Sequence, residues 1–139
     1  MQLKTTRFGV LALDDHRLVD FEDGIPGFPD FVQAALVEVD ANPDFYWLQS
    51  VDDGDLAFLT VVPWSFFADF EIVLSDDDQA AIDLEDAGDA FICCLVSPDR
   101  DQGSFTANLR APIVFNLRAG KAKQIILADE SLPLQAQLG

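Results

Sequence analysis

Short apolar runs separated by turn-forming residues make up almost the whole chain. Runs that are rich in Val, Ile and Phe and bounded by Gly, Pro or Asp are typical of strands in antiparallel sheets. The pattern predicts strands over residues 3–8, 10–13, 18–21, 34–39, 45–50, 57–62, 70–74, 91–96, 113–117 and 123–127. Many short strands joined by tight turns favour a mainly β fold, either a sandwich or a small antiparallel β-barrel, and we expect a closed or nearly closed barrel.

Helices are expected to be few and short. Ser75 precedes Asp76, Asp77 and Asp78, and a serine N-cap with acids in the first turn predicts a helix over residues 76–82. One further helical turn is expected over residues 28–31. The 139 residues fit one domain, which we place over residues 1–130. The tail over residues 131–139 is expected to be poorly ordered, as unanchored termini often are.

Acidic residues are distributed unevenly along the chain. Between Leu18 and Asp99 there are twenty Asp or Glu and no Lys or Arg, whereas residues 101–139 carry four basic and three acidic side chains. The formal net charge is −17, which repels nucleic acid and anionic membranes and attracts basic proteins. Because half of the residues are apolar and twelve are Phe, we expect a folded domain with an acidic surface.

A second explanation of the charge stays open. Twenty of the 25 acidic residues are Asp and lysine is scarce, a composition that adaptation to a salty habitat would also produce. This explanation accounts less well for the last forty residues, which escape the bias.

Residues suited to catalysis or metal binding are sparse. His16 is the only histidine, and no G-x-S-x-G motif, nucleotide-binding loop or zinc-ligand spacing accompanies it. The loop Asp52-Asp53-Gly54-Asp55 fails the calcium-loop pattern and fits a hairpin turn. The sequence therefore predicts a protein without catalytic residues, metal or cofactor. A carboxylate-based hydrolase stays a weaker alternative, since 25 acids offer many pairs.

Cysteine usage and apolar runs bear on the compartment. Cys93 and Cys94 are adjacent in a predicted strand, so they point to opposite faces and are expected to be two buried free thiols. Free thiols suit a reducing cytosol. The first residues, MQLKTTRFG, contain no long apolar run of a secretory signal, and no run is long enough to span a membrane. We expect a cytoplasmic protein that contacts no membrane.

Four large rings follow Pro63 within seven residues: Trp64, Phe66, Phe67 and Phe70. Most of them are expected to fill the core. A loop with this many rings has difficulty burying each one, and an exposed apolar patch rimmed by acids is suited to binding a protein. These residues are therefore candidates for partner binding.

Two segments carry a family resemblance. Residues 45–53, FYWLQSVDD, continue to Leu56-Ala57-Phe58, and residues 106–116 read TANLRAPIVFN. Together with residues 21–28, FEDGIPGF, with Leu74-Ser75-Asp76, and with residues 120–127, including Gln124, they resemble the flagellar assembly factor FliW family. The similarity covers residues 3–130 in order. One departure lies at the end, where the family's S-x-Y-P-I-R-H-P-L segment is replaced by SLPLQAQ over residues 131–137.

The resemblance implies a cytoplasmic, non-enzymatic β-barrel protein. We expect this protein to be a monomer when free. Family members bind flagellin before export and, when free of it, bind the translational regulator CsrA and relieve its repression of flagellin mRNA. We expect flagellin to use the apolar patch of Trp64, Phe66, Phe67 and Phe70, and CsrA to use Asp76, Asp77 and Asp78. The alternative that stays open is an acidic nucleic-acid mimic that inhibits another basic protein.

Overall fold

The computed structural model describes residues 2–12, 17–39, 42–99, 101 and 103–138. His16 lies outside these ranges. The strands are β1 (Gln2–Thr5), β2 (Gly9–Ala12), β3 (Arg17–Phe21), β4 (Gln33–Val39), β5 (Asn42–Ser50), β6 (Ala57–Val61), β7 (Phe91–Asp99), β8 (Ser104–Ala107), β9 (Ile113–Asn116), β10 (Lys121–Gln124) and β11 (Ala136–Gln137). The helix α1 covers Asp76–Ala81, and two single 3-10 turns cover Pro63–Ser65 and Ala87–Asp89.

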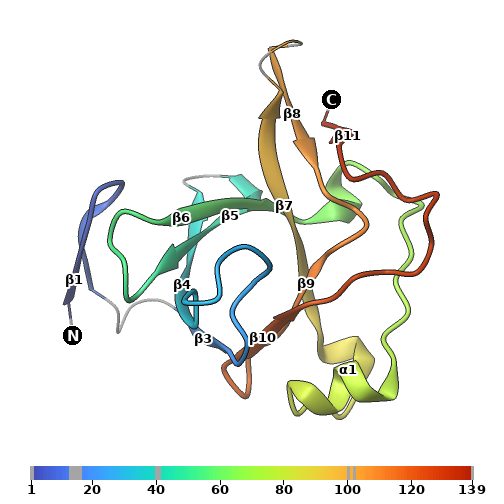
Figure 1. Cartoon of the computed structure of the whole chain (residues 1–139), viewed down its shortest axis with the longest axis horizontal. Coiled ribbons are helices and arrows are strands. Elements are labelled where there is room, and N and C mark those ends of the chain that lie inside the picture. Colours follow the sequence, from blue (N-terminus) through green and yellow to red (C-terminus); the bar gives the residue numbers. More distant parts are fainter. Residues whose placement is uncertain (1, 13–16, 40–41, 100, 102, 139) are drawn as a thin grey trace.

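Seven strands of the described chain close into a barrel in the order β7-β6-β5-β4-β3-β10-β9, and β9 pairs back with β7. Strands β3 to β7 follow one another as an antiparallel meander. The exception is β10, which runs parallel to β3 with Lys121 opposite Asp20 and Ala122 opposite Phe21. The predicted mainly β barrel is therefore confirmed, and Figure 1 shows β10 and β9 crossing the side of the barrel that the meander leaves open.

Two hairpins extend beyond the barrel. The β1–β2 hairpin forms a sheet of its own at one side (Figure 1). The second half of β7 leaves the barrel and pairs with β8, which in turn pairs with β11, so these strands form an arm that projects at the top of Figure 1. Strand β7 is nine residues long because its first half serves the barrel and its second half serves the arm.

Alternate residues of the barrel strands face the interior, as the period of two requires. On β3, Val19 and Phe21 are buried in the interior, whereas Asp20 between them is exposed. The Phe21 ring makes edge contacts with Phe31 and Phe115 at centroid distances of 5.5 and 6.4 Å. The buried interior comprises Val19, Phe21, Ile25, Phe31, Ala34, Leu36, Leu48, Cys93, Ile113, Phe115 and Ala122.

The outer faces of β4 and β7 are also covered, which explains their continuous apolar runs. The β1–β2 hairpin packs on Ala35 and Val37 of β4, and Arg7 lies 4.0 Å from the centroid of the Trp47 ring. On β7, Cys93 faces the barrel interior. Cys94 belongs to a second buried group of side chains, which we call the cluster beneath the arm: Val61, Phe70, Cys94, Ala107, Leu109 and Ala136. Both thiols are fully buried and free, so the prediction of two buried cysteines on opposite faces is confirmed.

Gly54 fixes where the β1–β2 hairpin docks. The amide of Thr6 donates to the Gly54 carbonyl at 3.0 Å, and a Cβ at Gly54 would lie only 2.1 Å from the Lys4 carbonyl oxygen. The Asp-Gly turn between β5 and β6 is thus confirmed, and its glycine also permits the close approach of another backbone.

The strand expected over residues 70–74 is not formed. Ile72 and Leu74 pack inward while Val73 is exposed, so the alternation indicated the burial correctly. Within the described part of the chain no strand pairs with this segment, and it runs as an extended connection to α1. Apolar alternation reports which side faces the core, and it does not report whether a hydrogen-bonding partner is present.

The helical turn expected over residues 28–31 is also wrong. Ile25 and Phe28 exchange two backbone hydrogen bonds of 3.3 and 2.8 Å, which makes this segment a tight loop. Pro29 accounts for the difference, because a residue before proline is pushed away from helical geometry. The sequence also missed β8, and β10 begins two residues before the predicted strand.

The C-terminal residues lie against the arm. Ala136 pairs with Ala107 of β8 and is buried, and the Leu109 amide donates to the Pro133 carbonyl at 3.1 Å. Arg110 holds the preceding segment by donating to the Glu130 and Leu132 carbonyls at 2.7 and 2.9 Å. The expected poor order of residues 131–139 concerns motion and stays a prediction, which hydrogen exchange at the Leu138 amide would test. The single domain over residues 1–130 also stays a prediction.

Gln49 secures the turn between β5 and β6. Its side chain is fully buried, and Nε2 donates to the carbonyls of Ser50, Asp53, Gly54 and Leu56 over 3.0–3.3 Å. Its Oε1 has no hydrogen-bond partner among the described atoms. The amide therefore acts as the donor for a loop whose carbonyls turn inward.

We predict that Gln49→Met lowers the free energy of unfolding by about 1–3 kcal/mol, because the carbonyls of the turn lose their buried donor. Urea unfolding followed by circular dichroism measures this loss. The matched control is Gln33→Met on β4, whose side chain is half-buried and donates to the exposed Asp20 at 3.1 Å. The control should change stability by less than about 0.5 kcal/mol. Equal effects of the two variants would contradict the role of Gln49.

Candidate functional site

Helix α1 begins where the sequence predicts. Ser75 has extended backbone angles, and its Oγ accepts a hydrogen bond of 3.0 Å from the Asp78 amide. Asp76 and Asp77 are exposed in the first turn, where negative charge favours the positive end of the helix. Asp78 is half-buried and forms an ion pair of 3.2 Å with Lys123 of β10. Of the predicted acidic cluster, Asp76 and Asp77 are thus exposed, and Asp78 is paired with a lysine of the barrel.

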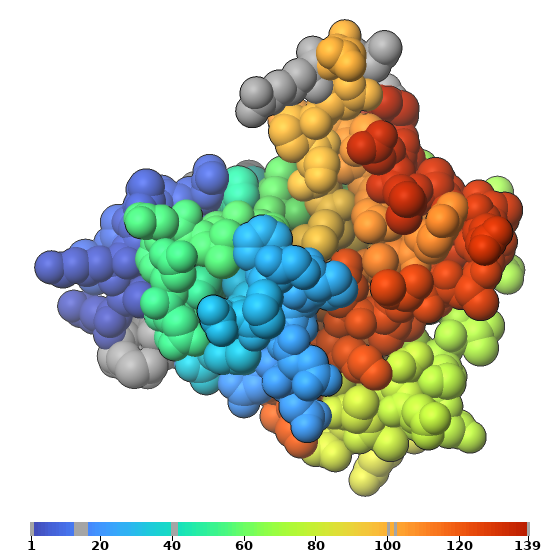
Figure 2. All heavy atoms as spheres, in the orientation of Figure 1, coloured from blue at the N-terminus to red at the C-terminus, as the bar shows by residue number. Residues whose placement is uncertain are grey.

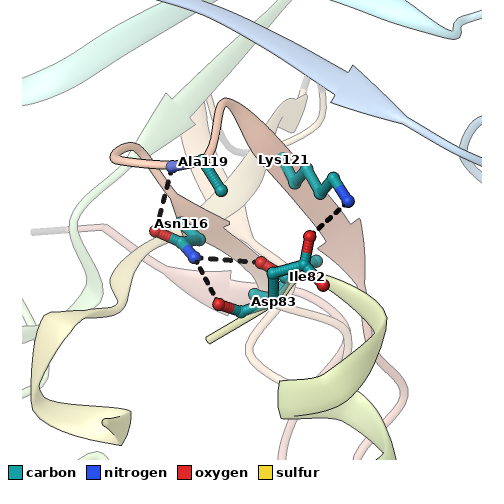
Figure 3. Close-up of polar contacts among 5 residues, drawn as sticks. All are labelled: Ile82, Asp83, Asn116, Ala119 and Lys121. Carbon is teal, nitrogen blue, oxygen red and sulfur yellow. Dashed lines mark hydrogen bonds and ion pairs between the residues drawn. The ribbon is translucent and has the colours of Figure 1, made fainter. Parts of the chain in front are cut away.

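The other end of α1 is fixed by the β9–β10 hairpin, as Figure 3 shows. Asn116 donates from Nδ2 to the carbonyls of Ile82 and Asp83 at 3.0 and 3.1 Å, and its Oδ1 accepts from the Ala119 amide at 3.3 Å. Asp83 has a φ of 54° and its carboxylate pairs with Lys121. These contacts satisfy carbonyls that the helix leaves unpaired and set the position of α1 beside β10.

The aromatic segment divides into exposed and buried rings. Trp64 and Phe66 are 40% and 39% exposed, whereas Phe70 is buried and Phe67 is half-buried against the cluster beneath the arm. The Trp64 Nε1 donates to the Phe70 carbonyl at 2.6 Å, and the Phe66 ring contacts Phe45 at 5.7 Å between centroids. Two of the four rings, Trp64 and Phe66, are therefore exposed and make up the apolar patch that we consider below, and Phe70 is not part of it.

The apolar patch and the acidic helix are separate surfaces. The chain leaves the 3-10 turn at Pro63–Ser65 and runs as the extended segment 70–74 down the side of the molecule to α1 (Figure 1). Asp69 and Glu71 are exposed along this route and contribute acids near the patch. The two predicted sets of binding residues are thus joined by chain continuity and are not one site.

The sequence missed a concave surface of the described structure. A groove of about 820 Å³ lies between the loop of residues 22–29, the end of α1 and strand β10. In Figure 2 the blue spheres of the loop, the orange-red spheres of β10 and the yellow-green spheres of α1 meet on the face shown. Its lining residues are Asp20, Glu22, Asp23, Gly24, Ile25, Pro26, Gly27, Pro29, Ala81, Ile82, Lys121, Ala122, Lys123 and Gln124.

The loop wall of this groove is rigidly built. Ile25 is buried in the barrel interior, and the Phe28 ring contacts Phe58 at 4.9 Å between centroids. Gly24 has a φ of +67°, and a Cβ there would lie 2.6 Å from the Phe28 carbonyl oxygen, so the turn requires glycine. The Gly/Pro-rich run after three closely spaced acids was the available sequence signal, and it predicted only a turn.

The charges of the groove are mostly negative. Asp20, Glu22 and Asp23 are exposed on one side. Asp83 raises the pKa of Lys121 through a hydrogen bond and its charge, and the charges of Glu22 and Asp20 add to this effect. Since Lys121 pairs with Asp83 and Lys123 with Asp78, both lysines are already neutralised by carboxylates outside the loop. With three acids and two lysines lining it, the groove keeps an excess of negative charge that attracts a cation.

Reactive chemistry is sparse on the described part of the chain. Among residues 2–12, 17–39, 42–99, 101 and 103–138, no group of three or more His, Cys, Asp or Glu is arranged to hold a metal ion. Burial raises the pKa of both the Cys93 and the Cys94 thiols to about 12, so these side chains stay protonated and unreactive. None of the helices formed by the described residues has the length and apolar character needed to cross a membrane.

The fold and surfaces define a class of small acidic β-barrel domains with a short helix fixed to one side. The family model described as "FliW protein" matches residues 2–138. The chain belongs to the FliW family. The flagellar assembly factor FliW of Alkaliphilus metalliredigens is 37% identical over 134 residues, covering 94% of this chain and 81% of the relative.

Further comparisons agree over the full length. The flagellar assembly factor FliW of Bacillus velezensis is 32% identical over 139 residues, covering 100% of this chain and 97% of the relative. A solved crystal structure of the flagellar assembly factor FliW superposes with a TM-score of 0.88 at 29% identity, covering 99% of this chain and 96% of that one. The resemblance noted in the sequence is confirmed, and the chain is a flagellar assembly factor of this family.

We predict that the native thiols resist modification and that alkaline pH weakens the fold. In the unfolded chain each thiol ionises near its ordinary pKa of 9.0, whereas the folded thiols ionise near 12. Stability from the buried thiols is therefore complete below pH 9 and is lost as the pH rises towards 12. A disulfide reagent such as dithiobis-nitrobenzoate at pH 8 should titrate two thiols in urea and fewer than about 0.1 per molecule in buffer. Rapid titration of the folded protein would contradict the prediction.

Proposed function

We propose that this protein binds flagellin in the cytoplasm and, when free of flagellin, binds a CsrA-like translational regulator and relieves its repression of flagellin mRNA. The observation that carries the proposal is family membership over residues 2–138 together with relatives named flagellar assembly factors. In this scheme the two partners compete, and the protein is monomeric between encounters. The amount of protein free to bind the regulator then reports how much flagellin awaits export.

The acidic surface supports the regulator arm of this proposal. None of the described acidic residues between Leu18 and Asp99 is buried, so the acidic side chains of this base-free stretch lie on the surface. A regulator that binds mRNA must present a basic face to the phosphate backbone. Acids on this protein attract such a face within about 8 Å at physiological salt and repel RNA approaching the same complex.

The exposed rings support the flagellin arm. Trp64 and Phe66 present apolar surface next to acids such as Asp69, a combination found at protein interfaces. We expect the ends of an unassembled flagellin to be amphipathic helices, and such helices dock their apolar side on exposed apolar surface. We assign Trp64 and Phe66 to flagellin and the acids of α1 to the regulator.

We predict a strong salt dependence of the encounter with the regulator. Raising the NaCl concentration from about 50 mM to about 500 mM should lower the association rate at least about tenfold and leave the dissociation rate nearly unchanged, because rim charges act mainly on association. Surface plasmon resonance with a purified CsrA-type regulator measures both rates, and flagellin serves as the less salt-dependent comparison.

Competition separates this proposal from its alternatives. Flagellin should displace the regulator, whereas an acidic nucleic-acid mimic would be displaced by RNA or DNA. If the wild-type protein binds neither flagellin nor the regulator at low salt, the proposed function fails.

We predict that two variants separate the partners. Phe66→Ser should weaken flagellin binding by about tenfold and leave regulator binding intact, because a large exposed ring is lost. The double variant Asp76→Asn with Asp77→Asn should do the reverse. Asp78 stays unchanged because it pairs with Lys123. Isothermal titration gives both affinities, and melting temperatures detect the loss of about 0.3–1 kcal/mol expected for each first-turn acid. Folded variants that affect both partners equally would contradict the assignment of the two surfaces.

A further inference from the structure

We propose that the groove between residues 22–29, the end of α1 and β10 is the docking site for a peptide segment that carries apolar residues and a lysine or arginine. The proposal rests on the proposed function, in which the partner that supplies this segment is the basic regulator and not flagellin. The groove meets the acidic cluster of α1 only at Asp78, which pairs with the groove residue Lys123, and shares no residue with the apolar patch, so we treat it as a third surface.

Shape is the first argument. The groove holds about 820 Å³, which lies within the size range of ligand-binding pockets and is enough for several side chains. Its floor and walls include Ile25, Pro26, Pro29, Ala81 and Ile82, so an apolar side chain would leave water on entering.

Charge is the second argument and selects the occupant. The groove and its ion pairs contain two lysines and five carboxylates, namely Lys121, Lys123, Asp20, Glu22, Asp23, Asp78 and Asp83. Asp83 and Asp78 neutralise the lysines, whereas Glu22 and Asp23 are exposed at the loop. Carboxylates at the edge of a concave surface concentrate a negative potential, so the complementary occupant is cationic.

Rigidity is the third argument. The loop wall is held by the paired backbone of Ile25 and Phe28, and the helix wall is held by Asn116 through the carbonyls of Ile82 and Asp83. The third wall is β10, paired with β3 through Ala122 opposite Phe21. All three walls are positioned before a partner arrives, which reduces the entropy that binding would otherwise cost.

Neighbouring alanines of α1 offer a matched steric test. Ala80 and Ala81 are both exposed, but only Ala81 lines the groove. Ala81→Phe fills the groove without altering charge, and Ala80→Phe adds the same ring one position away. With a purified CsrA-type regulator, Ala81→Phe should raise Kd at least about tenfold, mainly through faster dissociation. Ala80→Phe should change Kd by less than about threefold.

Charge reversal supplies the second arm. The groove variant carries Glu22→Lys and Asp23→Lys, which reverse the charge at the edge of the groove. The control variant carries Glu38→Lys and Asp52→Lys, which change the net charge by the same amount at exposed acids outside the groove. At high salt, where steering is screened, the groove variant should still bind at least about tenfold more weakly than the control variant. Circular dichroism and melting temperature establish that all four proteins are folded.

The outcomes distinguish the groove from the function. If Ala81→Phe and Ala80→Phe bind the regulator equally well, or if the groove variants lose flagellin and keep the regulator, the groove proposal is overturned while the proposed function stands. If the wild-type protein binds neither partner, the proposed function itself fails. Loss of regulator binding confined to the groove variants, with flagellin binding retained, supports the proposal.

Discussion

The pairing of β7 with β9 closes the barrel, and the remaining structure depends on it. Three residue pairs make this contact: Phe91 with Phe115, Ile92 with Val114, and Cys93 with Ile113. Because β9 also pairs with β10, the closing strand brings β10 beside β3. Without this contact the meander would be an open sheet with two exposed edges, which invites association with other chains. The same strand also carries Asn116 to the end of α1.

Closure and surface charge have opposite consequences for stability. A barrel of this kind buries Phe21, Phe31 and Phe115 in one compact interior, and that burial supplies the principal stabilising free energy. The acids repel one another on the outside, and this repulsion weakens the compact state. The lysines of β10 reduce it where acids are close, since Lys121 and Lys123 each pair with a carboxylate of the α1 region. Two lysines of β10 thus help to hold the acidic helix α1 against the barrel.

Local patterns in the sequence predicted much of this fold. Alternation placed β3 to β7, Ser75 placed the start of α1, and the adjacent cysteines were correctly assigned to opposite faces. These features depend on neighbours along the chain or on burial alone. The segment 70–74 was misassigned because its lack of a pairing partner is decided by distant strands.

The candidate site was less predictable for a related reason. The groove combines residues near 20, 80 and 120, and no short motif records that they meet. Tertiary packing also decides which rings of the aromatic segment are exposed. Phe70 is buried in the cluster beneath the arm, whereas Phe66 is exposed. Sequence reasoning identified acidic and aromatic residues suited to binding, and only the packing showed which of them form a surface.

The parallel contact between β3 and β10 sets an order of events during synthesis. Asp20 and Lys121 lie opposite each other, so about a hundred residues must be made after β3 before its second neighbour exists. The meander β3 to β7 forms from sequential contacts and can assemble while translation continues. The groove has no third wall until β10 has left the ribosome, so a nascent chain lacks this surface and acquires it only when the barrel is finished.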